Sequence, residues 1–174
     1  MSLRRIRTSL SIGAAASAAV ALVSCQSMPM MGGTGMKSEA MPEPNAESVA
    51  AHLKSQRYAQ AWKFYPGKQA LYTGQVPHGM LLTTYVNDVA FSALAAKAST
   101  MPYGAIIVKE NYTPDRKLAA VTVMYKSKGF NPSAGDWFWS KTAADGTVEA
   151  SGKAAGCIGC HTPSKRDFIL TPLS

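Results

Sequence analysis

Five consecutive residues near the carboxyl end, Cys157-Ile158-Gly159-Cys160-His161, carry the residue types best suited to chemistry. A Cys-x-x-Cys pair followed directly by His is the attachment pattern of c-type haem. The two thiols add to neighbouring vinyl groups of the macrocycle as thioethers, and the adjacent imidazole binds the iron as its proximal ligand. We therefore expect one haem c per subunit, anchored by Cys157 and Cys160 and ligated by His161.

Two other uses of this motif fit the sequence less well. A redox Cys-x-x-Cys needs no following His and usually opens a helix after a strand in a thioredoxin-like unit. A zinc site would need a second pair of ligands, and the remaining Cys and His residues are Cys25, His52 and His78. His78 lies in a Pro-His-Gly sequence and could ligate iron, but we interpret it as a turn residue. We interpret His52 as part of an amphipathic helix surface.

Residues 1–24 are predicted to be a lipoprotein-type signal peptide. Three arginines lie within the first seven residues, and the apolar run that follows, 12–23, is short for a membrane span. Leu22-Val23-Ser24-Cys25 resembles a bacterial lipobox, which predicts lipidation of Cys25; an ordinary cleaved signal is the alternative. Export leads to the periplasm, where bacteria attach c-type haem, and Gln26 after the lipidated Cys indicates the outer membrane.

Residues 25–44 are predicted to be a flexible tether rich in Met, Gly and Pro, and residues 45–174 to be the haem domain. The tether methionines could bind Cu(I), although a plain spacer is the simpler interpretation. The whole chain carries a net charge of +8, and loss of the three signal-peptide arginines leaves 15 basic and 10 acidic residues. This balance suits an anionic membrane surface or an acidic redox partner protein, and no pattern indicates nucleic-acid binding.

The haem domain is predicted to be α+β, mainly an antiparallel β-sheet with a few helices and a haem peptide at its carboxyl end. The pattern predicts helices over 45–62 and 88–98, and strands over 79–86, 104–112, 118–126, 137–141 and 147–150. Asp145-Gly146 is a strong hairpin turn. No Met follows His161, so a sixth iron ligand must come from upstream. Met124 is a candidate for that ligand, although core packing is the more ordinary role of a strand Met.

Strand 104–112 is the second informative stretch. Alternation places Lys109 on the same face as Ala105 and Ile107, and Glu110 on the other face. A lysine on a buried face is desolvated, which lowers its pKa and frees a nucleophilic amine.

The chain resembles the cytochrome P-460 family, including its cytochrome c'-beta branch, over most of Ala46 to Leu170. The resemblance rests on the Trp62 region, Pro77-His78-Gly79, Thr84-Tyr85-Val86-Asn87, Met101-Pro102, Gly104 to Glu110, Thr122 to Lys126, Gly135 to Trp139, the haem peptide and Asp167-Phe168. It implies a β-rich homodimer with one five-coordinate haem per subunit and an open distal side. In the true cytochromes P-460 a lysine is bonded to the macrocycle, and Lys109 matches its position.

One departure from the family pattern shapes the functional hypotheses. Members that oxidise hydroxylamine carry a distal carboxylate on the strand after the lysine strand, and this chain has no Asp or Glu between Asp115 and Asp136. We therefore expect an apolar distal haem face that binds a small diatomic ligand, nitric oxide. The alternatives are an enzyme that oxidises hydroxylamine or nitric oxide at a haem crosslinked to Lys109, and an electron carrier with Met124 as sixth ligand.

Overall fold

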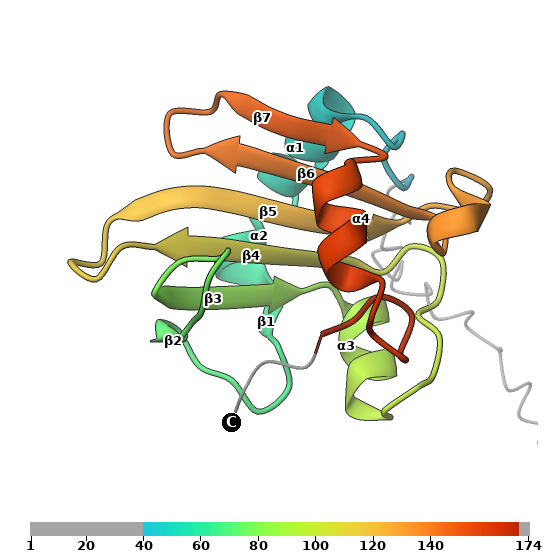
Figure 1. Ribbon diagram of the computed structural model, residues 1–174, viewed down its shortest axis with the longest axis horizontal. Helices are drawn as coiled ribbons and strands as arrows, with labels where there is room; N and C mark the ends of the chain where they lie inside the picture. The colour runs from blue at the N-terminus through green and yellow to red at the C-terminus, as the bar shows by residue number, and fades with distance from the viewer. Residues whose placement is uncertain (1–39, 171–174) are drawn as a thin grey trace, which may run out of the picture. The chain divides into compact units, whose positions relative to one another are not determined.

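The computed structural model describes residues 40–170 (Figure 1). The predicted signal peptide, Cys25 and most of the predicted tether lie outside the described residues. Within residues 40–170, no helix combines the length and apolar character needed to cross a membrane.

One antiparallel sheet contains every strand of the described region, in the order β1-β3-β4-β5-β6-β7, with β2 also paired to β3. The prediction of an α+β fold with a mainly antiparallel sheet is confirmed. The strands are β1 (Lys63–Phe64), β2 (Tyr72–Thr73), β3 (Leu81–Val86), β4 (Ile106–Tyr112), β5 (Leu118–Lys126), β6 (Trp137–Ala143) and β7 (Val148–Gly152). The helices are α1 (Ala46–Ser55), α2 (Tyr58–Ala61), α3 (Asp88–Ala95), α4 (Ala155–His161) and the 3-10 turn η1 (Pro132–Ala134).

Helices cover both faces of this sheet. Behind it in Figure 1, α1 and α2 pack on a cluster that includes Val49, Leu53 and Phe138. In front, α3 lies beside the lower strands and α4 crosses the middle of the sheet, over a cluster that includes Trp137 and Trp139. Alternation along each central strand therefore sends neighbouring residues to different cores.

Asparagine side chains cap the N-termini of α1 and α3. Asn45 Oδ1 accepts the backbone N–H of Ser48 at 2.8 Å at the start of α1. Asn87 caps α3 through the N–H of Ala90 at 3.0 Å, and the same Oδ1 accepts the N–H of Ile106 at 3.1 Å. Asn87 therefore fixes α3 against the first residue of β4, in addition to satisfying a helix end.

The predicted boundaries hold best where the pattern is strongest. β5 matches the predicted strand 118–126, and α3 ends at Ala95, short of the predicted residue 98. The single helix predicted over 45–62 is wrong: Arg57 adopts a left-handed conformation (φ 48°), which separates α1 from α2. Strands β1 and β2 span two residues each, too few to show any periodicity in the sequence.

Candidate functional site

The predicted haem peptide forms most of α4. Cys157, Cys160 and His161 are related as i, i+3 and i+4, so the helix places all three on one face. Both cysteines are free thiols; Cys157 is partly buried and Cys160 is exposed. His161 is buried, with 9% of its surface exposed.

A cavity of about 580 Å³ is lined by residues of α4 and of the sheet. Its volume falls within the usual range for sites that enclose a small molecule or cofactor. Cys157, Cys160 and His161 contribute from α4, and β4 and β5 contribute Lys109 and Met124. The structure thus brings together every predicted site residue that falls within its described part.

His161 is held in one tautomer by the segment that follows α4. Its Nδ1 donates to the carbonyl oxygen of Phe168 at 2.8 Å, because a carbonyl can only accept. Nε2 is then the unprotonated nitrogen, the form that binds a metal. Burial lowers the pKa of His161, so the ring is neutral at neutral pH. The Trp139 ring packs edge-on against the imidazole, with 4.8 Å between ring centroids.

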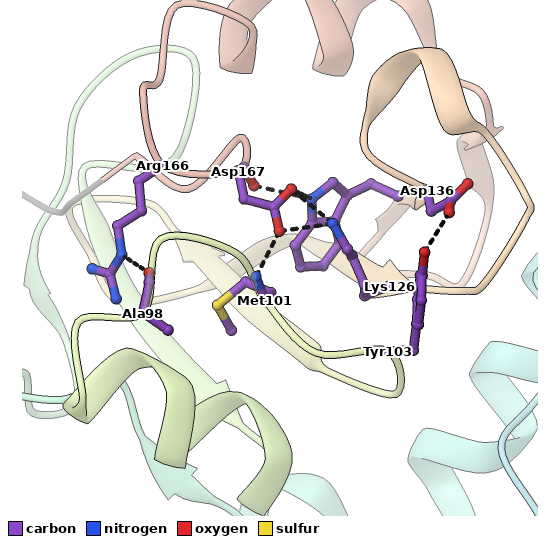
Figure 2. A network of polar contacts seen from close by, with 8 residues as sticks. Ala98, Met101, Tyr103, Lys126, Asp136, Arg166 and Asp167 are labelled. Atoms are coloured by element: carbon purple, nitrogen blue, oxygen red, sulfur yellow. Dashed lines mark hydrogen bonds and ion pairs between the residues drawn. The ribbon is translucent and has the colours of Figure 1, made fainter.

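A buried polar network fixes the position of Phe168 (Figure 2). Its neighbour Asp167 pairs with Lys126, with Nζ 2.7 Å from both carboxylate oxygens. The Asp167 side chain also accepts the backbone N–H of Met101 at 2.7 Å, and Trp137 Nε1 donates to the Asp167 carbonyl oxygen at 3.0 Å. Arg166 donates from Nε to the carbonyl of Ala98 at 2.8 Å. The carbonyl that orients His161 is therefore anchored to β5, β6 and the loop before β4.

Lys109 faces the cavity from β4, on the same side of the strand as Ile107. Desolvation by burial lowers the pKa of Lys109 to about 8. The positive charge of Lys109 also contributes to the lowered pKa values of His161 and His78. At neutral pH only about a tenth of this lysine is an uncharged amine, which is the nucleophilic form.

Sequence reasoning missed the position of His78. His78 lies in the turn region between β2 and β3, as expected, but its side chain also lines the cavity. Its ring centroid lies 6.4 Å from that of His161, and the two ring planes are 88° apart. Burial lowers the pKa of His78 to about 4. The sequence indicates only that Asn111, two residues after Lys109, lies on the same face of the strand as Lys109. In the structure, Asn111 Oδ1 lies 2.9 Å from His78 Nδ1.

The expectation of an apolar distal face is only partly right. Ile107, Val123 and Met124 supply apolar surface, but Lys109, Asn111 and His78 place polar groups in the same cavity. Among the described residues that line the cavity, the one with a carboxylate is Glu149 on β7. It forms an ion pair with Lys141 at 2.6 Å. Both partners are more than 40% exposed, so this carboxylate belongs to the solvent-facing edge.

These residues fit a covalently attached haem. Two thiols and a neutral imidazole with its Nε2 available are the donor set that c-type haem requires. Trp139 Nε1 is buried and has no hydrogen-bond partner among the described residues. Buried indole N–H groups normally find an acceptor, and a haem carries two propionate carboxylates that could supply one. The described region holds no cluster of three or more Cys, His, Asp or Glu side chains of the kind a zinc site needs.

Comparison with known proteins supports the same reading of the chain. The family model described as Cytochrome P460 matches residues 56–171, from the end of α1 through the haem peptide. No curated protein matches the chain.

Proposed function

The chain belongs to the cytochrome P460 family, and on that premise we propose that it is an exported c-type cytochrome that binds nitric oxide. Membership of the family implies a haem cofactor. The attachment through Cys157 and Cys160, the ligation by His161 and the identity of the ligand are parts of the proposal.

The observation that carries the proposal is the cavity beside α4. It is large enough for a cofactor and holds the two thiols and the neutral imidazole on one helix face. Much of its remaining lining is apolar, from residues such as Ile107 and Val123. Apolar walls favour a small uncharged molecule over a polar substrate, since a polar substrate would lose its hydration on entry.

Each residue of the site has a definite task in this proposal. Haem iron supplies the coordination position at which a diatomic molecule binds. Cys157 and Cys160 hold the macrocycle against α4, and His161 presents Nε2 to the iron because Phe168 holds its Nδ1–H. Ile107 and Val123 exclude water from the sheet side of the cavity.

Expression with a haem-ligation system tests the proposal. We expect one covalently bound haem per chain, which remains with the polypeptide after denaturation, and a nitric oxide adduct of the reduced protein at one ligand per haem. A Cys157→Ala, Cys160→Ala double variant retains His161 and should release all of its haem on denaturation. A colourless wild-type protein, or a reduced haem protein whose absorption does not change with nitric oxide, would refute the proposal.

A second candidate function is favoured by the desolvated Lys109. Its amine, with a pKa lowered to about 8, suits a bond to the macrocycle and hence an enzyme that oxidises hydroxylamine or nitric oxide. Such a bond replaces one N–H and one C–H, and the two hydrogens pass to an oxidant such as hydrogen peroxide. Mass spectrometry of the haem peptide decides: a crosslink joins it to the Lys109 peptide, lighter by two hydrogen atoms, and a Lys109→Met variant lacks the species.

An electron carrier with Met124 as sixth ligand is the remaining alternative. Met124 lines the same cavity from β5, where it pairs with Trp139 on β6. A Met124→Leu variant conserves the side-chain volume and removes the thioether. An unchanged spectrum in this variant would exclude methionine ligation.

We also propose that the mature protein is a homodimeric lipoprotein of the periplasm, attached to the outer membrane by lipid on Cys25. A variant in which residues 1–25 are replaced by a signal peptide that is cleaved without lipidation should move from the membrane fraction to the soluble periplasmic fraction. Light scattering of that soluble form should give twice the mass of one chain. A variant that stays in the membrane fraction would refute the lipid anchor, and a monomeric mass would refute the dimer.

A further inference from the structure

Lys109 is a cation with no counter-ion in the described part of the chain. Its side chain lines the cavity, and among residues 40–170 its ammonium group has no hydrogen bond or ion pair. Burial lowers its pKa to about 8, and no neighbouring carboxylate acts in the other direction. At neutral pH about nine-tenths of this lysine therefore remains charged. A positive charge on a desolvated group is costly unless an anion lies beside it.

The other charged and histidine side chains of the cavity do not balance Lys109. Glu149 is paired with Lys141 at 2.6 Å, so their charges cancel. His78 and His161 are neutral at neutral pH, since burial lowers the pKa of both rings. The described lining of the cavity therefore carries an excess positive charge, and this charge comes from Lys109.

The carboxylate next to Lys109 in the sequence lies on the other side of the sheet. Glu110 follows Lys109 in β4, and alternation along the strand sends it to the opposite face. There it accepts hydrogen bonds from Tyr58 at 2.9 Å and Tyr112 at 2.6 Å, so both of its oxygens are engaged. β4 thus provides a charge on the cavity side without the acid that would neutralise it.

The charge of Lys109 acts close to the proposed haem site. It contributes to the lowered pKa values of His161 and His78, so the ammonium lies near both rings. A lysine ammonium offers three N–H donors, and these have no acceptor among residues 40–170. Ile107 and Val123 give the same cavity apolar surface, where a charge-assisted hydrogen bond is stronger than in water.

We propose that this cavity binds a small monovalent inorganic anion, held by a charge-assisted hydrogen bond from the Lys109 ammonium. The inference goes beyond the proposed function, because nitric oxide is uncharged and gains little from the ammonium. It requires a lysine that is not bonded to the macrocycle, in contrast to the second candidate function. The net charge of +8 on the whole chain attracts anions to the protein. Apolar walls then select a weakly hydrated anion, since a strongly hydrated one loses more solvation on entry.

Isothermal titration calorimetry of the oxidised holoprotein with sodium azide tests the inference. Azide is a weakly hydrated monovalent anion, and we expect the wild type to bind one azide per chain. Lys109→Met keeps the length of the side chain and removes its charge, so the affinity for azide should fall about 10–100-fold. Sodium nitrite, a second small monovalent anion, should compete with azide in the wild type.

Two comparisons separate the charge of Lys109 from general damage to the site. In Lys109→Met, the affinity of the reduced protein for nitric oxide should fall far less than the affinity of the oxidised protein for azide. Lys141→Met is the matched control, since it removes a cavity lysine whose side chain is 46% exposed and paired with Glu149. Its affinity for azide should change by less than about fivefold. Lys109→Gln, a second neutral variant, should show the same loss if Lys109→Met does not fold.

The possible outcomes distinguish this inference from the proposed function. A wild type that binds no azide, or binds it no more tightly than Lys109→Met does, would overturn the inference and leave the proposed function standing. A crosslink between Lys109 and the macrocycle would also overturn it, since the bonded nitrogen no longer forms the ammonium. A chain without covalent haem would overturn the proposed function alone. Because the titration measures heat, that same full-length chain still shows whether azide binding depends on Lys109.

Discussion

The ion pair between Lys126 and Asp167 gives the sharpest test of how the site is held. The side chains are only 6% and 8% exposed, and Nζ lies 2.7 Å from each carboxylate oxygen. In an Asp167→Asn variant the side chain keeps nearly the same shape but loses its charge, so the Lys126 ammonium remains buried without a counter-ion. Removing one partner of a buried pair costs about 3–5 kcal/mol.

That loss should be visible as a large fall in thermal stability. At roughly 4 °C per kcal/mol for a domain of this size, the melting temperature should drop by about 12–20 °C. Circular dichroism of the holoprotein at far-ultraviolet wavelengths measures it. Asp115→Asn is the control: Asp115 pairs with Lys117, but their side chains are 58% and 81% exposed, so the variant should lose no more than about 1 kcal/mol.

A double variant distinguishes the buried charge from ordinary loss of packing. Lys126→Met combined with Asp167→Asn removes both charges of the pair, so neither is left buried without its partner, and the double variant should be more stable than the sum of the two single losses predicts. The reasoning would be refuted if Asp167→Asn cost no more than Asp115→Asn, or if the two single losses simply added. The Asp167→Asn holoprotein should also show an altered proximal ligation spectrum, since Asp167 precedes the carbonyl that orients His161.

Three further changes test other parts of the fold. Gly135→Ala should destabilise the protein by at least about 1 kcal/mol in urea unfolding, because φ is +65° there and the new Cβ would lie 2.9 Å from Asp167 Oδ1; unchanged stability would contradict this. Asn45→Ala should lose about 1 kcal/mol, as expected for a helix cap, in the same assay, and a loss below a few tenths would argue against capping. Burial and the adjacent Glu110 raise the pKa of Tyr58, so above about pH 10 the unfolded chain loses a proton that the folded protein keeps, and stability falls as pH rises. Tyr58→Phe should make that fall shallower above about pH 10, and an equally steep fall would exclude this contribution.

Most of the sheet was predictable because alternation along a strand is a local property. β5 follows its predicted range, and the cavity-facing side of β4 follows from the period of two that pairs Ile107 with Lys109. The haem-attachment motif could also be predicted, since the Cys-x-x-Cys-His spacing is itself what attachment of c-type haem requires. These features need no knowledge of the tertiary structure.

The features that depend on distant contacts were not predictable. His78 and Asn111 are 33 residues apart and meet only because β3 and β4 pair in one particular register. Lys126 and Asp167 are 41 residues apart, and neither residue indicates in the sequence that its charge is buried. The interruption between α1 and α2 at Arg57 also could not be predicted from the sequence, because arginine is an ordinary helix former.

The acceptor behind the proximal imidazole has a consequence for redox chemistry. His161 donates its Nδ1–H to an uncharged peptide oxygen of Phe168, where many metal-binding histidines donate to a carboxylate. A carboxylate would pull the proton and give the ring imidazolate character, which strengthens electron donation and stabilises ferric iron. The neutral acceptor leaves the ring a weaker donor, so the ferrous state is favoured in comparison. In the proposed haem complex this bias would come from the peptide backbone, and reduced iron is the state that holds nitric oxide most firmly.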